Sequence, residues 1–335
     1  MSRTAPVAST ARLSPRGAPR RGVVCGAGGV LGFAWTVGAL LALREAEGFE
    51  PGSADVLLGT SAGSVMAAFL GAGVPLDTIY RHQLGVPAEG KPVIDYDSAV
   101  DSGGPLPPRP ELRMGSRGLA LRAALHPWRY PPAAALSSLL PRGRGSMAPI
   151  GRMVEGFVPA GEWVPHPATW IVAMDYDTGK RVPFGRPGSP PAGLSEAVMA
   201  SCAIPGWYAP VSVGGRRYVD GGTCSATSVD LLAHRGLDEV IVLAPMASFE
   251  YDMPTSMPAR IERTIRRATS RRLLHEVEKV RRGGTEVTIL APGRKDLLAI
   301  GSNLMDPRRR ERVLETSLRT TAAALAERPD WLAAG

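Results

Sequence analysis

The apolar residues of this chain fall into short runs separated by glycine-rich turns and helical segments. Short, mostly apolar runs, which indicate buried strands, lie at 21–25, 55–58, 169–174, 239–243 and 286–290. Helices are predicted after the first two runs, over about 33–46 and from Ala62 to about Leu70. The order strand, turn, helix therefore occurs twice in the first 70 residues, which is typical of α/β folds.

A hairpin and a further helix are predicted in the middle of the chain. Residues 195–202 (SEAVMASC) predict a helix with a serine cap, closed before Pro205. Residues 211–213 and 217–219 flank a Gly-Gly pair, which is a hairpin signal.

The segment 257–282 has helical composition, but its apolar residues do not share one face. Ile261 and Ile265 lie on one side, whereas Leu273 and Val277 lie about a third of a turn away. This pattern predicts a break in the helix near Ser270.

Composition divides the chain into four parts. Residues 1–20 are rich in Ser, Pro and Arg without periodicity, which predicts a disordered basic tail. The main domain is expected at 21–245. Within it, about 85–150 is rich in Pro, Gly and Arg and is expected to be a partly mobile insertion or lid, with short helices near 116–125 and 132–140. Residues 246–335 are expected to be a mainly helical extension.

The net charge of +8 is unevenly distributed. Residues 1–22 carry five arginines and no acid, and residues 257–282 carry eight arginines and one lysine against three glutamates. The rest of the chain is slightly acidic, which argues against a nucleic-acid-binding protein. The three cysteines have neither the spacing of a zinc site nor an even number, so a cytoplasmic protein without metal is expected.

One apolar run resembles a signal peptide or membrane span. Arg20 and Arg21 precede an uncharged run from Val23 to Leu43 that is long enough to cross a bilayer. The run contains five glycines, four of them within seven positions, which would destabilise such a helix. We therefore expect neither a signal peptide nor a transmembrane helix.

A candidate nucleophile lies between the second predicted strand and its helix. Residues 59–63 (GTSAG) match the GxSxG pattern, in which a sharp turn exposes the serine and glycines let strand and helix approach each other. Ser61 is therefore predicted to be a nucleophile, supported by Gly59 and Gly63.

The glycine-rich stretch 26–32 (GAGGVLG) admits two interpretations. It lies between a strand and a helix, where backbone N–H groups could stabilise an oxyanion. The alternative is a dinucleotide-binding GxGxxG loop. If the motif began at Gly26, its third glycine would fall at Leu31, and if it began at residue 27, its first glycine would be Ala27. The ribose-binding acid would then be Glu45, Glu47 or Glu50. This alternative also leaves Ser61 without a role.

An aspartate is better placed than the histidines to deprotonate Ser61, although an aspartate next to two glycines is often only a turn residue. None of the five histidines has a triad-like position, and each is interpreted as a surface or loop residue: His82, His126, His166, His234 and His275. Asp220 directly follows the predicted hairpin and precedes Gly221 and Gly222, so a tight turn would present its carboxylate.

Together these motifs resemble those of the patatin-like phospholipase family, over about residues 21–245. The elbow at 59–63, the loop at 27–32 and the Asp220 turn occur in the family's order, and 200–206 (ASCAIPG) is similar to the segment that precedes its base. The resemblance implies a three-layer α/β fold with a central, mostly parallel sheet flanked by helices, plus a helical insertion and a helical C-terminal extension. Ala27 and Leu31 depart from the family, which usually has glycine and a basic residue there.

The resemblance also implies a function. Ser61 and Asp220 would form a catalytic dyad, partly buried, with an oxyanion hole at Gly28, Gly29 and Val30. Gly32 would support the loop. The expected reaction is hydrolysis of lipid carboxylic esters, first of all phospholipids, without cofactor or metal.

The sequence also suggests where such a substrate is met. The usual explanation of a basic run such as 257–282 is a solvated helix face. The alternative is that the basic flanks contact an anionic membrane surface peripherally, at the inner face. The insertion is apolar enough to help bind lipid, through Leu119, Leu121, Leu125, Trp128, Leu139 and Leu140. Two alternatives stay open, a catalytically silent lipid-binding protein and a nucleotide-dependent oxidoreductase.

Overall fold

We analysed a computed structural model, which describes residues 19–86, 108–250, 254 and 256–327. The predicted tail, apart from residues 19 and 20, and the part of the predicted insertion from 87 to 107 lie outside the described residues.

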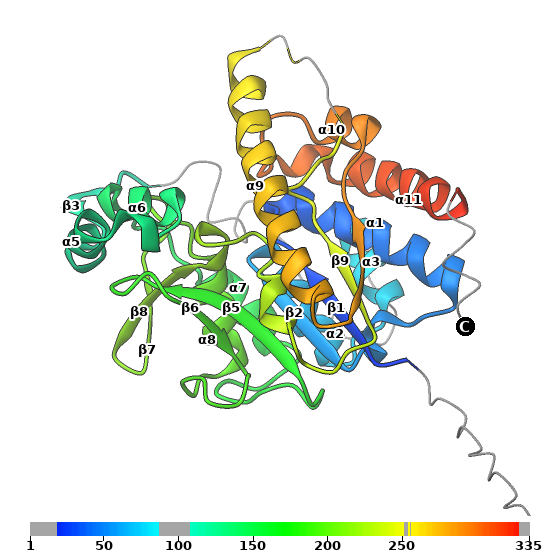
Figure 1. Ribbon diagram of the computed structural model, residues 1–335, viewed down its shortest axis with the longest axis horizontal. Helices are drawn as coiled ribbons and strands as arrows, with labels where there is room; N and C mark the ends of the chain where they lie inside the picture. The colour runs from blue at the N-terminus through cyan, green and yellow to red at the C-terminus, as the bar shows by residue number, and fades with distance from the viewer. Residues whose placement is uncertain (1–18, 87–107, 251–253, 255, 328–335) are drawn as a thin grey trace, which may run out of the picture.

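A mixed eight-stranded sheet forms the centre of the molecule (Figure 1). The strands follow the spatial order β10-β9-β1-β2-β5-β8-β7, and β6 pairs with the other edge of β5. The first five of these strands are parallel, β6 and β8 each pair antiparallel with β5, and β7 pairs antiparallel with β8. The strands are β1 (Arg21–Cys25), β2 (Val56–Thr60), β5 (Thr169–Asp175), β6 (Arg181–Phe184), β7 (Val211–Val213), β8 (Arg216–Asp220), β9 (Glu239–Leu243) and β10 (Glu286–Leu290). The predicted mostly parallel sheet and its hairpin are confirmed.

Helices cover both faces of this sheet, which gives three layers. Successive strand residues alternate between two cores: Val23 packs under one helical layer and Val24 under the other. The first layer contains α1 (Gly29–Glu47), α2 (Ala62–Gly71), α3 (Leu76–Gln83), α7 (Ala148–Glu155), α8 (Leu194–Cys202), α10 (Arg294–Ile300) and α11 (Arg310–Ala326). The opposite face is covered by α9 (Met257–Arg281) and by a short 3-10 turn, Val229–Leu232. Figure 1 shows α9 crossing in front of the strands.

Helix α1 is long and apolar enough to cross a membrane, but it is a core helix here. About 72% of its apolar window is buried inside the protein. It packs along α11 so closely that a Cβ on Gly38 would lie 2.4 Å from the carbonyl oxygen of Leu314. The helix begins at Gly29, four residues before the predicted start.

The predicted break in α9 is wrong, because the helix is continuous from Met257 to Arg281. Its two apolar sets face different surroundings: Leu273 and Val277 pack on the sheet, while Ile261 remains exposed. The Ser270 hydroxyl lies within 2.9 Å of the Arg266 carbonyl oxygen one turn earlier, a bond that a continuous helix accommodates.

The described part of the insertion forms a separate lobe beside the sheet. It contains β3 (Glu111–Met114), α5 (Arg117–Leu125), the turn η2 (Pro127–Arg129), α6 (Pro132–Leu139) and β4 (Pro141–Arg142). Both predicted insertion helices are present. Leu119 is buried in a small core with Met174 and Tyr176, so it is not available to bind lipid as expected.

The remaining differences concern helix ends. Helix α8 begins at Leu194, and the Glu196 carboxylate accepts from the Gly193 N–H at 2.9 Å, so the predicted serine cap is wrong. Ser195 lies inside the first turn. Helices α3 and α7 and strand β6 were not predicted, because each is short. Helices α10 and α11 lie in the extension that was expected to be mainly helical, although their bounds were not predicted.

Candidate active site

The site lies where two strands meet end to end against β5. Thr60, the last residue of β2, pairs with Val172, and Asp220, the last residue of β8, pairs with the adjacent Ala173. Because β6 occupies the other edge of β5, β2 and β8 share one edge and their C-terminal ends point toward each other. This topology brings Ser61 and Asp220 together although 159 residues separate them.

Ser61 occupies a strained turn between β2 and α2. Its φ is 54° and its ψ is −126°, a conformation that non-glycine residues rarely adopt. Helix α2 starts directly behind it and passes so close to β1 that a Cβ on Gly63 would lie 1.9 Å from the Cys25 carbonyl oxygen. Any side chain at position 63 would collide with β1, so a glycine is needed here for α2 to lie this close to the strand.

Ser201 on α8 holds this turn in place, a role that the sequence analysis did not identify. Its Oγ accepts from the Ser61 N–H at 2.8 Å and donates to the Val172 carbonyl oxygen at 2.6 Å. Ser201 is fully buried and fills the gap between the ends of β2 and β8. The only sequence signal was its place in the segment 200–206.

Asp220 is buried beside Ser61. Burial raises the pKa of its carboxyl group to about 6, against smaller lowering effects of hydrogen bonds from Ser61 and from the Gly222 N–H. The Gly222 bond is 2.7 Å long. A Cβ on Gly221 would lie 2.4 Å from the carbonyl oxygen of Val172, so only glycine fits at this position. A base with a pKa near 6 is ionised at neutral pH and more basic than a hydrated aspartate.

The glycine loop places unused N–H groups near Ser61. Gly28 precedes α1. Within the described residues, the N–H groups of Gly28, Gly29 and Val30 donate no hydrogen bond. The N–H groups of Ala27 and Leu31, where the chain departs from the family pattern, already donate to the backbone, at 2.7 and 2.9 Å. The free groups lie at the positive end of the α1 dipole, where an oxyanion is stabilised.

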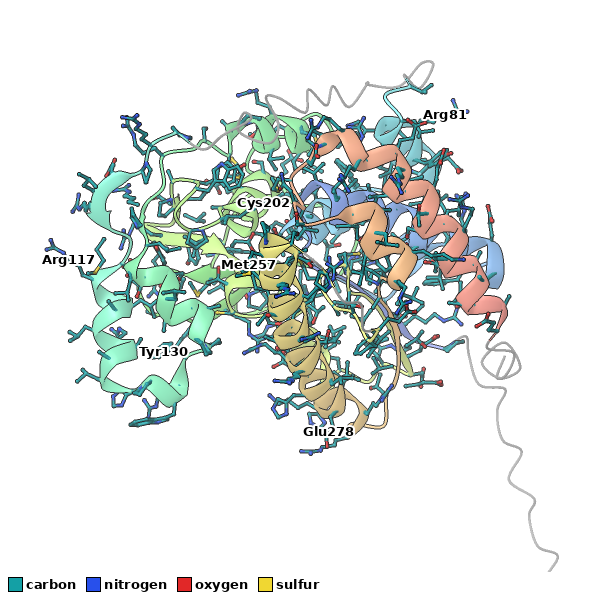
Figure 2. The ribbon with its side chains drawn as sticks, turned by 90° about the horizontal axis from the view of Figure 1, so that it is seen from above. Arg81, Arg117, Tyr130, Cys202, Met257 and Glu278 are labelled. Atoms are coloured by element: carbon teal, nitrogen blue, oxygen red, sulfur yellow. The ribbon has the colours of Figure 1, made fainter. Side chains whose placement is uncertain are left out.

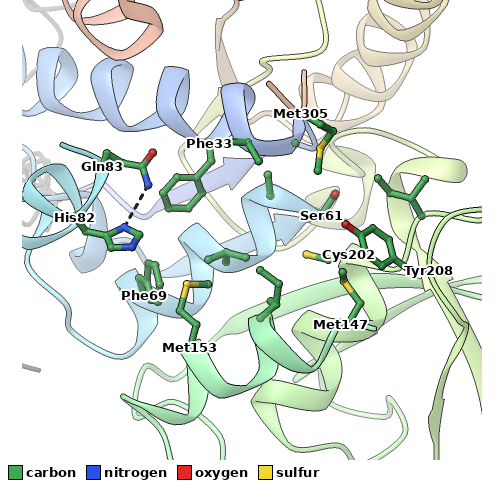
Figure 3. A pocket seen from close by; sticks show the side chains of 16 residues that line it. Phe33, Ser61, Phe69, His82, Gln83, Met147, Met153, Cys202, Tyr208 and Met305 are labelled. Atoms are coloured by element: carbon green, nitrogen blue, oxygen red, sulfur yellow. Dashed lines mark hydrogen bonds between the residues drawn. The ribbon is translucent and has the colours of Figure 1, made fainter. Parts of the chain in front are cut away.

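A narrow apolar pocket leads away from Ser61 into the protein (Figure 3). Its volume is about 680 Å³, including the open mouth. Ala62, Val65 and Phe69 of α2 lie along one wall, which spans about 10 Å of helix. Met147 and Met153 contribute to the opposite side.

His82 is the exception among the histidines. It was expected at the surface, but it is buried in α3 at the far end of this pocket from Ser61, with Phe33 and Phe69 between them (Figure 3). Burial lowers its pKa to about 4. Gln83 Nε2 lies 3.3 Å from its Nδ1. His82 therefore closes the pocket and does not contact Ser61.

A wider groove opens on the outer side of Ser61. It measures about 1800 Å³ with its open side, and Ser61 and Asp220 lie on its floor. The insertion helix α6 and helix α9 line its walls, and Arg272 is the one charged lining residue besides Asp220 among those described. Ser61 lies at the junction of the narrow pocket and the groove, so an ester bound there could place its two halves in different spaces.

A family model for patatin-like phospholipases matches residues 23–233, which include the glycine loop, Ser61 and Asp220. The chain belongs to the patatin-like phospholipase family. Lipid acyl hydrolysis is thus its activity at the level of the family, and its motifs appear in the patatin-like order. The family assignment leaves the dinucleotide interpretation of the glycine loop without support.

Two solved structures are similar to this patatin-like chain. VipD from Legionella pneumophila is 14% identical, with a TM-score of 0.45, over 92% of this chain and 67% of VipD. The type III effector protein ExoU is 15% identical, with a TM-score of 0.33, over 92% of this chain and 53% of ExoU. The chain therefore spans about two thirds and about half of these structures.

Proposed function

We propose that this chain is a serine acyl hydrolase that cleaves lipid carboxylic esters, most readily phospholipids, through a dyad of Ser61 and Asp220. The observation that carries the proposal is that Ser61, in a strained turn, and the buried carboxylate of Asp220 both line the groove where it meets the apolar pocket.

The first half of the reaction forms an acyl-enzyme. Ser61 Oγ attacks the ester carbonyl carbon while Asp220 takes the hydroxyl proton. The negative charge on the carbonyl oxygen is stabilised by the N–H groups of Gly28, Gly29 and Val30. When the tetrahedral intermediate collapses, the ester C–O bond breaks and the leaving alcohol takes the proton from Asp220.

Water completes the cycle. Asp220 accepts a proton from a water molecule that attacks the acyl-enzyme, and the second intermediate releases the carboxylic acid. Ser61 recovers its proton from Asp220. No metal or cofactor is required, because one carboxylate and backbone donors supply each proton transfer and charge contact.

The two spaces around Ser61 suggest how the substrate lies. The apolar pocket suits an acyl chain, because its lining offers almost no hydrogen-bond partners near Ser61. The groove suits the larger alcohol portion, such as a glycerophosphate, near Arg272.

A phospholipid substrate would be met at a membrane surface, so the proposal includes a peripheral membrane location, with the cytoplasmic side as expected from the sequence. The basic flanks remain candidates for the contact, although several of their arginines have structural partners. Arg20 and Arg21 pair with Asp55 and Glu239, and Arg266 is buried against the chain itself.

Hydrolysis of a short-chain chromogenic ester and of a labelled phospholipid tests the proposal. Wild type should cleave both without added metal or nucleotide. Ser61→Ala and Asp220→Ala should lose activity by about a hundredfold or more. Ser53→Ala is the matched control. Ser53 precedes β2 and does not line the site, so this variant should keep full activity.

Two outcomes would redirect the proposal. Unchanged hydrolysis by Ser61→Ala would exclude Ser61 as nucleophile. Lipid binding by wild type without any hydrolysis would favour the silent lipid-binding protein. A nucleotide titration tests the oxidoreductase alternative, for which we expect no binding.

A further inference from the structure

Large apolar side chains on the surface are concentrated in two segments. Fifteen are exposed among the described residues, of which eight lie between 112 and 140 and three between 257 and 265. Such a concentration marks an interaction surface, whereas single exposed apolar residues do not. These eleven are Leu112, Met114, Leu121, Leu125, Trp128, Leu136, Leu139, Leu140, Met257, Ile261 and Ile265.

Helix α5 has an apolar side that faces solvent. It buries Leu119 and Ala123, while Leu121 and Leu125 lie one turn apart on the other side and are more than 60% exposed. The turn η2 follows directly and leaves Trp128 78% exposed. An exposed tryptophan at the end of an apolar helix side is typical of residues that sit at a membrane interface.

Two further apolar edges face each other across the outer groove. Leu136 and Leu139 are exposed on α6, and Met257, Ile261 and Ile265 are spaced four residues apart along α9. Figure 2 shows the insertion helices at the left edge of the molecule and α9 next to them, between Met257 and Glu278.

The groove between these edges leads to the dyad. Leu136 lines one wall and Ile265 the other, and Ser61 and Asp220 form part of the floor. The exposed apolar residues are thus continuous with the path that a lipid ester must take to reach Ser61.

The charge of the described part of the insertion favours an anionic partner. Residues 108–147 contain seven arginines and one glutamate, and none of the seven forms an ion pair within the described residues. Arg117, Arg122 and Arg129 are exposed on α5 and η2, beside the apolar residues. In contrast, Arg272 of α9 bonds to Glu276 at 2.9 Å. Arginines without partners beside exposed apolar residues suit a surface that offers both phosphates and acyl chains.

We propose that the insertion and the N-terminal half of α9 form a face that docks on anionic phospholipid membranes and opens the groove directly to the lipid. The apolar residues enter the interface and the insertion arginines contact lipid phosphates. The docking face comprises Leu121, Leu125, Trp128, Leu136, Leu139, Met257, Ile261 and Ile265. The inference rests on the proposed function, and it places the membrane contact mainly in the insertion rather than in the basic flanks.

Sedimentation with vesicles tests the docking face directly. The full-length Ser61→Ala protein, which cannot consume the vesicles, should bind vesicles of phosphatidylcholine with phosphatidylglycerol more strongly than vesicles of phosphatidylcholine alone. Trp128→Ser and Ile261→Ser in this background should each weaken binding by about tenfold, since each removes a large apolar group from the interface. Leu298→Ser, at an equally exposed leucine on α10, is the matched control and should bind normally.

Activity and charge separate this inference from the proposed function. In the active enzyme, Trp128→Ser should lower hydrolysis of vesicle phospholipid but leave hydrolysis of a soluble short-chain ester unchanged. Arg122→Glu should weaken the preference for anionic vesicles, because it removes one of several cationic contacts, and Trp128→Phe should restore most binding.

Three results decide the matter. Absence of vesicle binding by wild type and by Ser61→Ala, with soluble ester still cleaved, would overturn the docking face alone and favour a protein partner. Normal binding by the Trp128→Ser and Ile261→Ser variants would also overturn it. Loss of binding in these variants, with no ester cleaved by wild type, would support the docking face and refute the proposed hydrolase.

Discussion

Replacement of Asp220 by asparagine should abolish activity and yet stabilise the protein at neutral pH. The carboxyl group is 6% exposed, and burial raises its pKa from the ordinary 3.8 to about 6. Asparagine has the same shape and can still accept from the Gly222 N–H. It therefore removes a buried charge while keeping the main contact of that side chain.

The sign of the pH dependence follows from proton binding. Between pH 3.8 and about 6, the folded protein holds the Asp220 proton more tightly than the unfolded chain does, so the free energy of unfolding falls as pH rises. A shift of about two pKa units corresponds to about 3 kcal/mol. Asparagine does not titrate, so the free energy of unfolding of the variant does not fall in this way. The difference in this free energy between variant and wild type should therefore rise by about 3 kcal/mol between pH 4 and 6.5 and stay constant at higher pH.

Urea unfolding of both proteins from pH 4 to 8 measures this difference, because the other titrating groups contribute equally to both. Asp175→Asn is the matched control: this buried carboxylate pairs with Arg216 at 3.1 Å, so its replacement should destabilise the protein. In wild type, kcat/KM for a soluble ester should fall below pH 6, where Asp220 is protonated. A difference in stability that is independent of pH would refute the desolvation of Asp220.

Three further substitutions test the geometry of the site. Ser201→Ala should lower kcat about tenfold or more and leave KM for a short-chain ester little changed, because the Ser61 N–H loses the hydrogen bond that fixes the backbone of the nucleophile. Ser201→Thr keeps a hydroxyl group and should recover part of kcat in the same assay. Ile150 of α7 lines the apolar pocket, so Ile150→Trp should fill it. We then expect kcat/KM to fall strongly for an octanoyl ester and little for an acetyl ester, and an equal fall for both would place the acyl chain elsewhere. Gly63→Ala would bring a Cβ within 1.9 Å of the Cys25 carbonyl oxygen, so we expect a lower melting temperature and a nearly inactive protein, and normal stability would contradict the close packing of α2 on β1.

The sequence alone identified the features that depend on neighbours along the chain. Strands β1, β2 and β5 are mostly apolar, and the Gly-Gly pair at 214 and 215 fixes the hairpin because both residues have positive φ. The elbow around Ser61 was predicted for the same reason, since a strained turn between strand and helix requires glycines at set positions. Motif order, read as a family resemblance, added Asp220 as its partner.

Tertiary structure decided what depends on residues far apart in the chain. The register on β5 determines that Ser61 meets Asp220 and that Ser201 fits between the two strand ends. Sequence periodicity could not show that α9 is continuous. Leu273 and Val277 pack in the core, whereas Ile261 and Ile265 are exposed, so the apolar residues of this one helix do not share a face. Nor could periodicity show that His82 is buried while Trp128 is exposed, since burial depends on which elements pack against a residue, and local spacing carries no record of that packing.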